Sequence, residues 1–335
     1  MNTTTEAQTN AAPVQPPQPM SPWYRDTAIW WGGAGVLCFS FTLPATHLAI
    51  PAFGGLVVGL GRAIIAAGLA GLVLVLRRDP LPPRQTWPGL VLVALGVVIG
   101  FPLFSALALQ GTSVAHGAII TGLLPAATAI GGVVRARERP SVLFWLSCAA
   151  GTVAVLLFVI VQGAGHLQPG DGWMLAAVAA GAMGYTEGGR LARELGGWRV
   201  ICWALVLAAP VLVLPVGWTL LQHGIQGNPG AWFGLGYVSV FSMFLGFFAW
   251  YRGLALGGIA RIGQIQLLQP LLTIGWAALF LGESLTLATG LTALLVLLCV
   301  AVGQRNRRRD IIQNPLPESL AQTDPGLTVG AVEEE

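Results

Sequence analysis

Apolar stretches of about 20 residues are the feature of this sequence that most constrains its fold. A helix needs about 20 apolar residues to cross the hydrocarbon core of a bilayer, and ten stretches of the 335-residue chain reach that length. They span residues 27–46, 54–76, 88–109, 113–134, 141–162, 172–191, 199–221, 230–252, 259–281 and 285–303. Because 55% of the residues are hydrophobic and only 9% are charged, one water-soluble core could not bury them. The sequence therefore predicts an all-α integral membrane protein with ten transmembrane helices.

Arginine placement predicts the orientation of these helices. All 17 basic residues are arginine, and short cytoplasmic loops retain basic residues while translocated loops lose them. With the N-terminus inside, 16 of the 17 arginines fall at the cytoplasmic face, and the loops near His47, His166 and His223 contain none. We therefore expect a multi-pass protein of the plasma (inner) membrane with both termini cytoplasmic. The polar residues 1–24 and 304–335 are predicted to be disordered cytoplasmic tails.

A segment in the middle of the chain is repeated near its end. The stretch "AIITGLLPAATAIGGVVRARERP" is echoed 145 residues later by "GQIQLLQPLLTIGWAALFLGESL", with Pro125 matching Pro270 and Glu138 matching Glu283. This spacing divides ten helices into five per half, and because five is odd the second half must be inverted. Residues 25–165 and 166–303 are therefore predicted to be two inverted five-helix repeats, an arrangement typical of secondary transporters.

The repeated segments also carry a family resemblance. In "LALQGTSVAHGAIITGLLPAATAIGGVVRARERP" and "LALGGIARIGQIQLLQPLLTIGWAALFLGESLT", a small-residue turn precedes a helix with a central proline and a terminal glutamate. This pattern resembles the EamA domain of the drug/metabolite transporter (DMT) superfamily, and Arg62 matches the arginine typical of that family's second helix. The resemblance implies a ten-helix bundle that moves small metabolites. The first copy departs from the family, because Arg137 stands where the second copy has Gly282.

Ionisable groups at membrane depth are costly, so each is a candidate for function. Arg62 lies within the second predicted helix, either as the counter-charge to a substrate carboxylate or as a structural tie to helix-end carbonyls. Glu187 lies near the cytoplasmic end of the sixth helix. It is either a proton-coupling carboxylate or a member of an interfacial charge network with Arg190 and Glu194.

The ninth predicted helix offers three amide side chains. Gln266 and Gln269 should share one helix face, while Gln264 should point elsewhere. Pro270 should free the carbonyl of Gln266 from its helical hydrogen bond, and Pro125 should kink the fourth helix in the same way. The amides could bind the polar groups of an amino acid, or they could hydrogen-bond between helices.

Tyr185, Tyr251 and His116 complete the candidates for substrate binding or gating, Tyr185 being the deepest. We expect no metal site, because the four histidines are not predicted to converge, and no cofactor. No catalytic motif is present, so an enzyme is not expected, and the net charge of +3 is too small to indicate a nucleic-acid partner.

The favoured function is a secondary-active transporter in the lipid bilayer that exports small metabolites by alternating access. Amino acids, particularly hydrophobic or aromatic ones, are the favoured substrates, and protons are the candidate coupling ion. Two alternatives stay open. One is a transporter of another solute class, such as a sugar or a drug, and the other is a non-transporting membrane scaffold or an intramembrane enzyme.

Overall fold

The computed structural model describes residues 22–138, 140–162, 168–224 and 226–284, together with separate positions between 286 and 299. Within these residues the chain is helical and contains no strand, which confirms the predicted all-α class. Six of the described stretches are long and apolar enough to cross a membrane. The predicted tails, apart from helical residues 22–24, and most of the predicted helix 285–303 lie outside the described residues.

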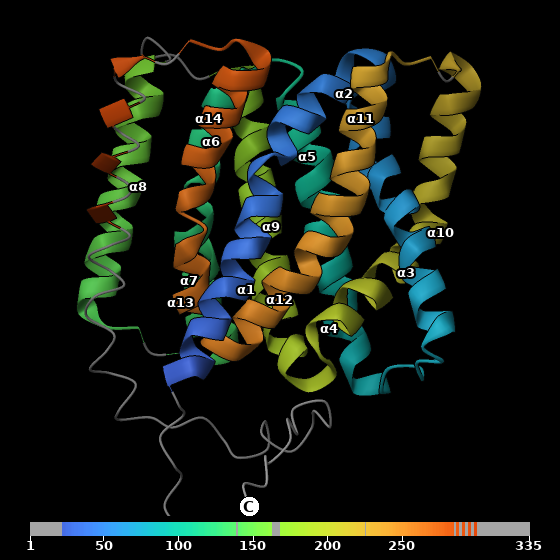
Figure 1. Ribbon diagram of the computed structural model, residues 1–335, viewed down its shortest axis with the longest axis horizontal. Coiled ribbons are helices and arrows are strands. Elements are labelled where there is room, and N and C mark those ends of the chain that lie inside the picture. Colours follow the sequence, from blue (N-terminus) through green and yellow to red (C-terminus); the bar gives the residue numbers. More distant parts are fainter. Residues whose placement is uncertain are drawn as a thin grey trace, which may run out of the picture.

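The helices pack side by side in one bundle (Figure 1). The first half of the chain forms α1 (Pro22–Ser40), α2 (Thr42–Leu56), η1 (Val57–Gly61), α3 (Arg62–Leu76), η2 (Arg84–Thr86), α4 (Trp87–Val93), η3 (Ala94–Gly100), α5 (Phe101–Ala108), α6 (Val114–Thr121), α7 (Leu124–Ala136) and α8 (Val142–Gln162). The second half forms α9 (Pro169–Leu195), α10 (Gly197–His223), α11 (Pro229–Tyr237), η4 (Val238–Leu245), α12 (Gly246–Gly257), α13 (Ile259–Ile265) and α14 (Leu268–Leu281).

The first predicted loop is misplaced. The sequence predicts a loop around His47, but α2 continues past it and the chain turns at Gly54. Gly54 has a φ of 73°, a left-handed conformation that glycine adopts without the steric cost of a Cβ atom. The turn therefore forms at this glycine, and His47 lies on a helix.

The two helices that carry the repeated prolines are broken rather than kinked. Helices α6 and α7 are separated at residues 122–123, and α13 and α14 at residues 266–267. Each proline lies in the first turn of the second piece, where a missing N–H costs little. The predicted free carbonyl is wrong, because the Gln269 N–H donates to the Gln266 carbonyl at 2.9 Å. The chain before Pro270 tightens into i→i+3 bonds, which occupy the carbonyl that the proline would have freed.

Helix α9 lies in the middle of the bundle and packs against α5, α7, α12 and η3. Its approach to η3 is close enough for backbones to touch, since a Cβ atom on Gly96 would lie 2.7 Å from the Gly184 nitrogen. Small residues permit this type of helix contact in membranes. The contact fixes α9 against η3 beside the pocket described below.

The two ends of the bundle differ in charge. At one end, Arg77 stacks on Trp198 and Arg252 stacks on Trp31, and further arginines follow at the ends of α7 and α9. We call this the arginine end; it is the lower end in Figure 1. The opposite end contains the starts of α6 and α9 and the turn after α14, and we call it the histidine end after His116 of α6.

Candidate functional site

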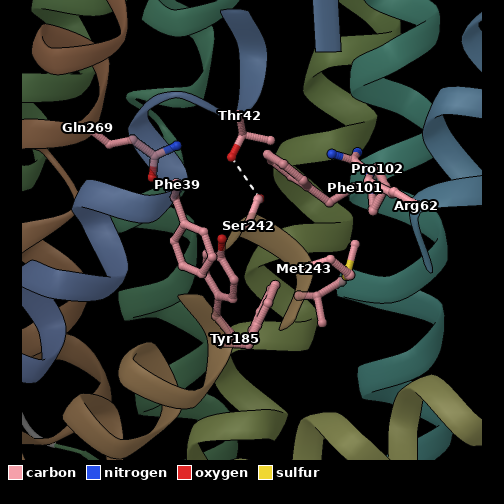
Figure 2. Close-up of a pocket in the computed structure, with 11 residues that line it drawn as sticks. Phe39, Thr42, Arg62, Phe101, Pro102, Tyr185, Ser242, Met243 and Gln269 are labelled. Carbon is pink, nitrogen blue, oxygen red and sulfur yellow. Dashed lines mark hydrogen bonds between the residues drawn. The ribbon is translucent and has the colours of Figure 1, made fainter. Parts of the chain in front are cut away.

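A pocket opens inside the bundle between segments from both halves of the chain (Figure 2). About 300 Å³ of space between atoms, including its open part, belongs to it. Its lining comprises Phe39, Thr42, Arg62, Val97, Phe101, Pro102, Tyr185, Ser242, Met243, Phe247 and Gln269. Of the predicted site residues, the pocket brings together Arg62, Tyr185 and Gln269.

Irregular helix surrounds this pocket. The segments η1, η3 and η4 are π-helical, and π-helical turns are rare and frequently occur at functional sites. Arg62 directly follows η1, Val97 lies in η3, and Ser242 lies in η4. The break between α13 and α14 lies directly before Gln269. Irregular backbone at membrane depth is tolerated where it is buried in protein or lines a cavity, so its concentration here marks the pocket as the part of the bundle built for something other than packing.

Arg62 is the charged group of the pocket, and it is 1% exposed. Its Nε donates a long hydrogen bond of 3.4 Å to the carbonyl of Gly59 in the preceding turn, and its Nη2 has no partner. No carboxylate in the described part of the chain pairs with it. A single long bond is weak support for a purely structural tie, and the guanidinium is left with donor capacity for an anion.

The walls of the pocket are aromatic with a few neutral polar groups. The rings of Phe39 and Tyr185 stack with centroids 6.2 Å apart, and Phe247 lies 5.0 Å from Phe39. Thr42 and Ser242 share a hydrogen bond of 2.8 Å between their hydroxyl groups (Figure 2). One cation, an apolar wall and two hydroxyls form a site for a small molecule that carries a carboxylate and an apolar body.

The three glutamines of the ninth predicted helix occupy different places. Gln266 Nε2 donates to Gln269 Oε1 at 3.2 Å, as expected of two side chains on one face. Gln269 lines the pocket, whereas Gln264 and Gln266 are absent from its lining. Both amide atoms of Gln264 are buried without a partner, so this side chain does not join helices in the way that the packing alternative requires.

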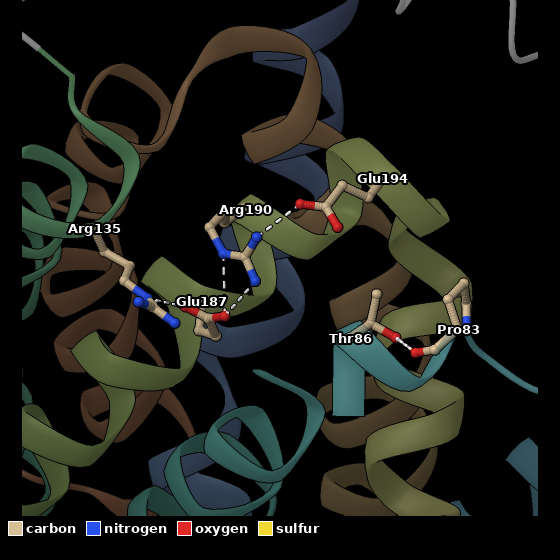
Figure 3. Close-up of polar contacts among 6 residues, drawn as sticks. All are labelled: Pro83, Thr86, Arg135, Glu187, Arg190 and Glu194. Carbon is tan, nitrogen blue, oxygen red and sulfur yellow. Dashed lines mark hydrogen bonds and ion pairs between the residues drawn. The ribbon is translucent and has the colours of Figure 1, made fainter. Parts of the chain in front are cut away.

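Glu187 belongs to a charge network at the arginine end (Figure 3). Its carboxylate accepts from Arg135 Nε at 2.8 Å and from Arg190 Nη2 at 2.7 Å, and Arg190 also pairs with Glu194 at 2.7 Å. These contacts match the interfacial network predicted as one alternative. Two arginines stabilise the ionised carboxylate, which gives no support to a proton-coupling role for Glu187.

Tyr251 and His116 lie outside the pocket lining. Tyr251 is fully buried and its hydroxyl donates to the Gly184 carbonyl at 3.1 Å, so it joins α12 to α9. His116 Nε2 lies 2.7 Å from Asp171 Oδ1 at the histidine end. The prediction that these two side chains contact substrate therefore finds no support in their positions.

The repeated glutamates cap helices at opposite ends of the bundle. Glu283 accepts the first two N–H groups of α6 at 3.0 Å each. Glu138 accepts the first two N–H groups of α13 at 2.8 and 2.7 Å, and it also pairs with Arg193 at 2.8 Å. Carboxylates at helix N-termini are stabilising. Each glutamate thus joins the end of its own broken helix to the start of the other one.

Several pocket residues were not predicted from the sequence. Thr42 and Ser242 are polar residues in apolar spans, which is the signal that could have revealed them, but hydroxyl groups are common in membrane helices. Phe39 and Phe101 look like any other lipid-facing or core aromatic residue in the sequence. Their role emerges only when the four segments that carry them are placed around one space.

Comparisons with known proteins agree with this architecture. The sequence matches the EamA-like transporter family over residues 26–160 and again over residues 168–302. It is 46% identical over 284 residues to the "Uncharacterized transporter YdeK" of Bacillus subtilis (strain 168), covering 84% of this chain and 98% of that protein. A solved structure described as "Crystal structure of protein" has a TM-score of 0.63 and 18% identity over 83% of this chain and 98% of its own, which shows a shared fold. The chain belongs to the EamA-like transporter family.

Proposed function

We propose that this membrane transporter is secondary-active and exports small metabolites that carry a carboxylate and an apolar body. Amino acids with hydrophobic or aromatic side chains are the favoured class. The observation that carries the proposal is Arg62, a buried guanidinium with an unpaired Nη2 on a pocket walled by aromatic rings.

The charge of the pocket favours carboxylates over the other solute classes. A guanidinium presents donors in a planar fork that matches a carboxylate, and such charge-assisted bonds are about twice as strong as neutral ones. A cationic drug would be repelled by Arg62, and a neutral sugar would leave the guanidinium without a counter-charge. The rings of Phe39, Tyr185 and Phe247 then suit an apolar side chain.

Equivalent backbone features support two inverted five-helix repeats, residues 25–165 and 166–303. Adding 145 residues to the start of α6 gives the start of α13, and η3 and η4 overlap under the same shift. Arg137 and Gly282, also 145 residues apart, both end their helices in the left-handed conformation. With such repeats the pocket lies between halves that can rock around it, as alternating access requires.

The orientation of the proposed exporter follows from the two ends of the bundle. Cytoplasmic loops carry the excess of basic residues, so the arginine end faces the cytoplasm of a plasma membrane. The histidine end then faces outward. A substrate released there has crossed the membrane in the export direction.

Transport by purified protein in proteoliposomes tests the proposal. The probes are radiolabelled phenylalanine and leucine, with phenylalaninamide as the analogue that lacks the carboxylate. Arg62→Gln should lower phenylalanine transport roughly 10- to 100-fold, since a hydrogen bond to a charged group contributes about 1.5–3 kcal/mol. Arg84→Gln, at an exposed position near the start of η2, is the matched control and should transport normally.

Two results would reject different parts of this proposal. Normal phenylalanine transport by the Arg62 variant, or equal transport of phenylalaninamide, would remove the carboxylate site. Failure of every labelled amino acid to move, with or without a pH gradient, would remove the amino-acid class.

A further inference from the structure

A buried pair of titratable side chains joins α6 to α9 at the histidine end. His116 is the third residue of α6, and its Nε2 lies 2.7 Å from Asp171 Oδ1. Both side chains are less than one-tenth exposed. The other carboxylate oxygen, Asp171 Oδ2, accepts the Gln168 N–H at 2.8 Å. The imidazole is thus held against a carboxylate that is itself fixed at the start of α9.

Few other titratable groups lie on the elements around this pair. Helices α2, α8, α9 and α14 pack against α6. Asp171 comes from α9, Glu283 follows α14 and caps the start of α6, and α2 carries His47. Among the described residues of α8, Cys148 is the titratable group, and it lies in the arginine-end half of that helix. His116 therefore faces two carboxylates and no arginine of these elements at its own end.

The corresponding position at the arginine end carries a different cation. Adding 145 residues to His116 gives Arg261, which is likewise the third residue of its helix, α13. Arginine stays protonated in proteins, whereas imidazole gains or loses its charge between about pH 5 and 8. The two ends share their glutamate caps, so the side chain at this position is the difference that lets the histidine end respond to protons.

We propose that His116 and Asp171 form a proton-binding site that holds the histidine end closed when it is protonated, and that this proton is the coupling ion of transport. The proton-binding site stands on the geometry alone, and its coupling role rests on the proposed transport function. A proton from water on the outer side adds to an imidazole nitrogen, and the same proton leaves to water on the cytoplasmic side after the arginine end opens.

The sign of the effect follows from the bond. An imidazolium bonded to a carboxylate makes a charge-assisted hydrogen bond, which is about twice as strong as a neutral one. Loss of the proton weakens the contact that joins α6 to α9. Low pH therefore favours the closed histidine end, and higher pH favours its opening.

A cysteine reporter measures this opening without any substrate. Thr46 is fully buried on α2, one turn from the pocket residue Thr42 toward the histidine end, and Thr46→Cys is placed in a chain whose four native cysteines are changed to alanine. The rate of maleimide labelling is measured at pH 5.5 and 7.5 and divided by the rate for the same reporter with His116→Gln. The division cancels the pH dependence of the thiol chemistry.

The expected ratio rises about five-fold from pH 5.5 to 7.5, the factor that corresponds to about 1 kcal/mol of lost bond strength. Asp171→Asn should abolish the rise, and His47→Gln, the matched histidine control on α2, should preserve it. A ratio that stays flat, or a rise that His47→Gln abolishes, would overturn the proton-binding site.

The converse variant keeps the proposal decidable where His116→Gln does not fold. Arg261→His should make the arginine end pH-dependent, reported by Thr128→Cys on α7, which is buried against α13. Absence of that new response would count against the site. If phenylalanine is transported, His116→Gln should retain phenylalanine exchange but lose stimulation by a pH gradient; loss of neither would leave transport intact and remove the coupling role.

Discussion

Replacing Arg62 by methionine should stabilise the protein while it removes substrate binding. The guanidinium is 1% exposed, makes one hydrogen bond of 3.4 Å to the preceding turn, and leaves Nη2 without a partner. A charge in this position raises the free energy of the empty folded state, because neither water nor a carboxylate compensates it. Methionine fills a similar length with an apolar and flexible side chain.

The size of the effect can be bounded from two sides. A charged residue at the centre of a membrane helix costs about 2.5–3.5 kcal/mol on insertion scales, and one unsatisfied buried polar group costs about 1–3 kcal/mol. Arg62 recovers part of this through its bond to Gly59, so we expect Arg62→Met to stabilise by about 2 kcal/mol. At about 2–4 °C per kcal/mol for chains of 150–250 residues, the rise in apparent Tm is about 4 °C or more.

Thermal unfolding in detergent, followed by loss of the monodisperse peak, measures this shift. Phenylalanine at about 100 times its Kd should stabilise the wild type by about 2.7 kcal/mol and should not stabilise the variant. Arg190→Met is the control of opposite sign, because it removes one of the two arginines that hold buried Glu187. A lower Tm for Arg62→Met would refute the reasoning, since it would show that the guanidinium stabilises the empty bundle.

Two further pairs of variants test the packing around the site. Glu138→Gln should lower the apparent Tm more than Glu283→Gln, because Glu138 loses an ion pair in addition to its cap; the added loss should be about 1 kcal/mol, and equal shifts would contradict it. Gly188→Ala should lower the yield of folded protein or destabilise it by at least about 2 kcal/mol, since its Cβ would overlap the ring of Tyr251. Gly172→Ala on the same helix meets no neighbour and should be neutral or stabilising by up to about 1 kcal/mol, so equal effects of the two glycine changes would argue against the contact.

The helical segments could be predicted because the bilayer imposes their length. Apolar runs of about 20 residues reveal where the chain crosses, and the described helices largely follow them. The breaks within these runs were harder to predict. Gly54 is one glycine among 45, and only its left-handed φ of 73° distinguishes it as the turn. The carbonyl of Gln266 was expected to be free because proline removes a donor, but the neighbouring Gln269 N–H supplies another.

The pocket could be predicted only in part, because its residues are separated widely in the sequence. Arg62 is visible as a charge inside an apolar run, and Gln269 as an amide beside a proline. Thr42 and Ser242 are 200 residues apart and meet through one hydrogen bond, which no local pattern encodes. The π-helical turns are likewise invisible in the sequence, since their residues are the same apolar types that form the adjoining α-helices.

The repeat shows how backbone and side chains divide the work in this bundle. Arg137 takes the left-handed conformation that glycine holds at position 282, so the departure seen in the sequence does not change how the helix ends. Backbone geometry at corresponding positions is thus retained even where a residue is poorly suited to it. His116 and Arg261 differ in the opposite sense, because the backbone is the same and the chemistry is not. If transport has a direction, the residues that impose it should lie at such positions, where equal frames carry unequal side chains.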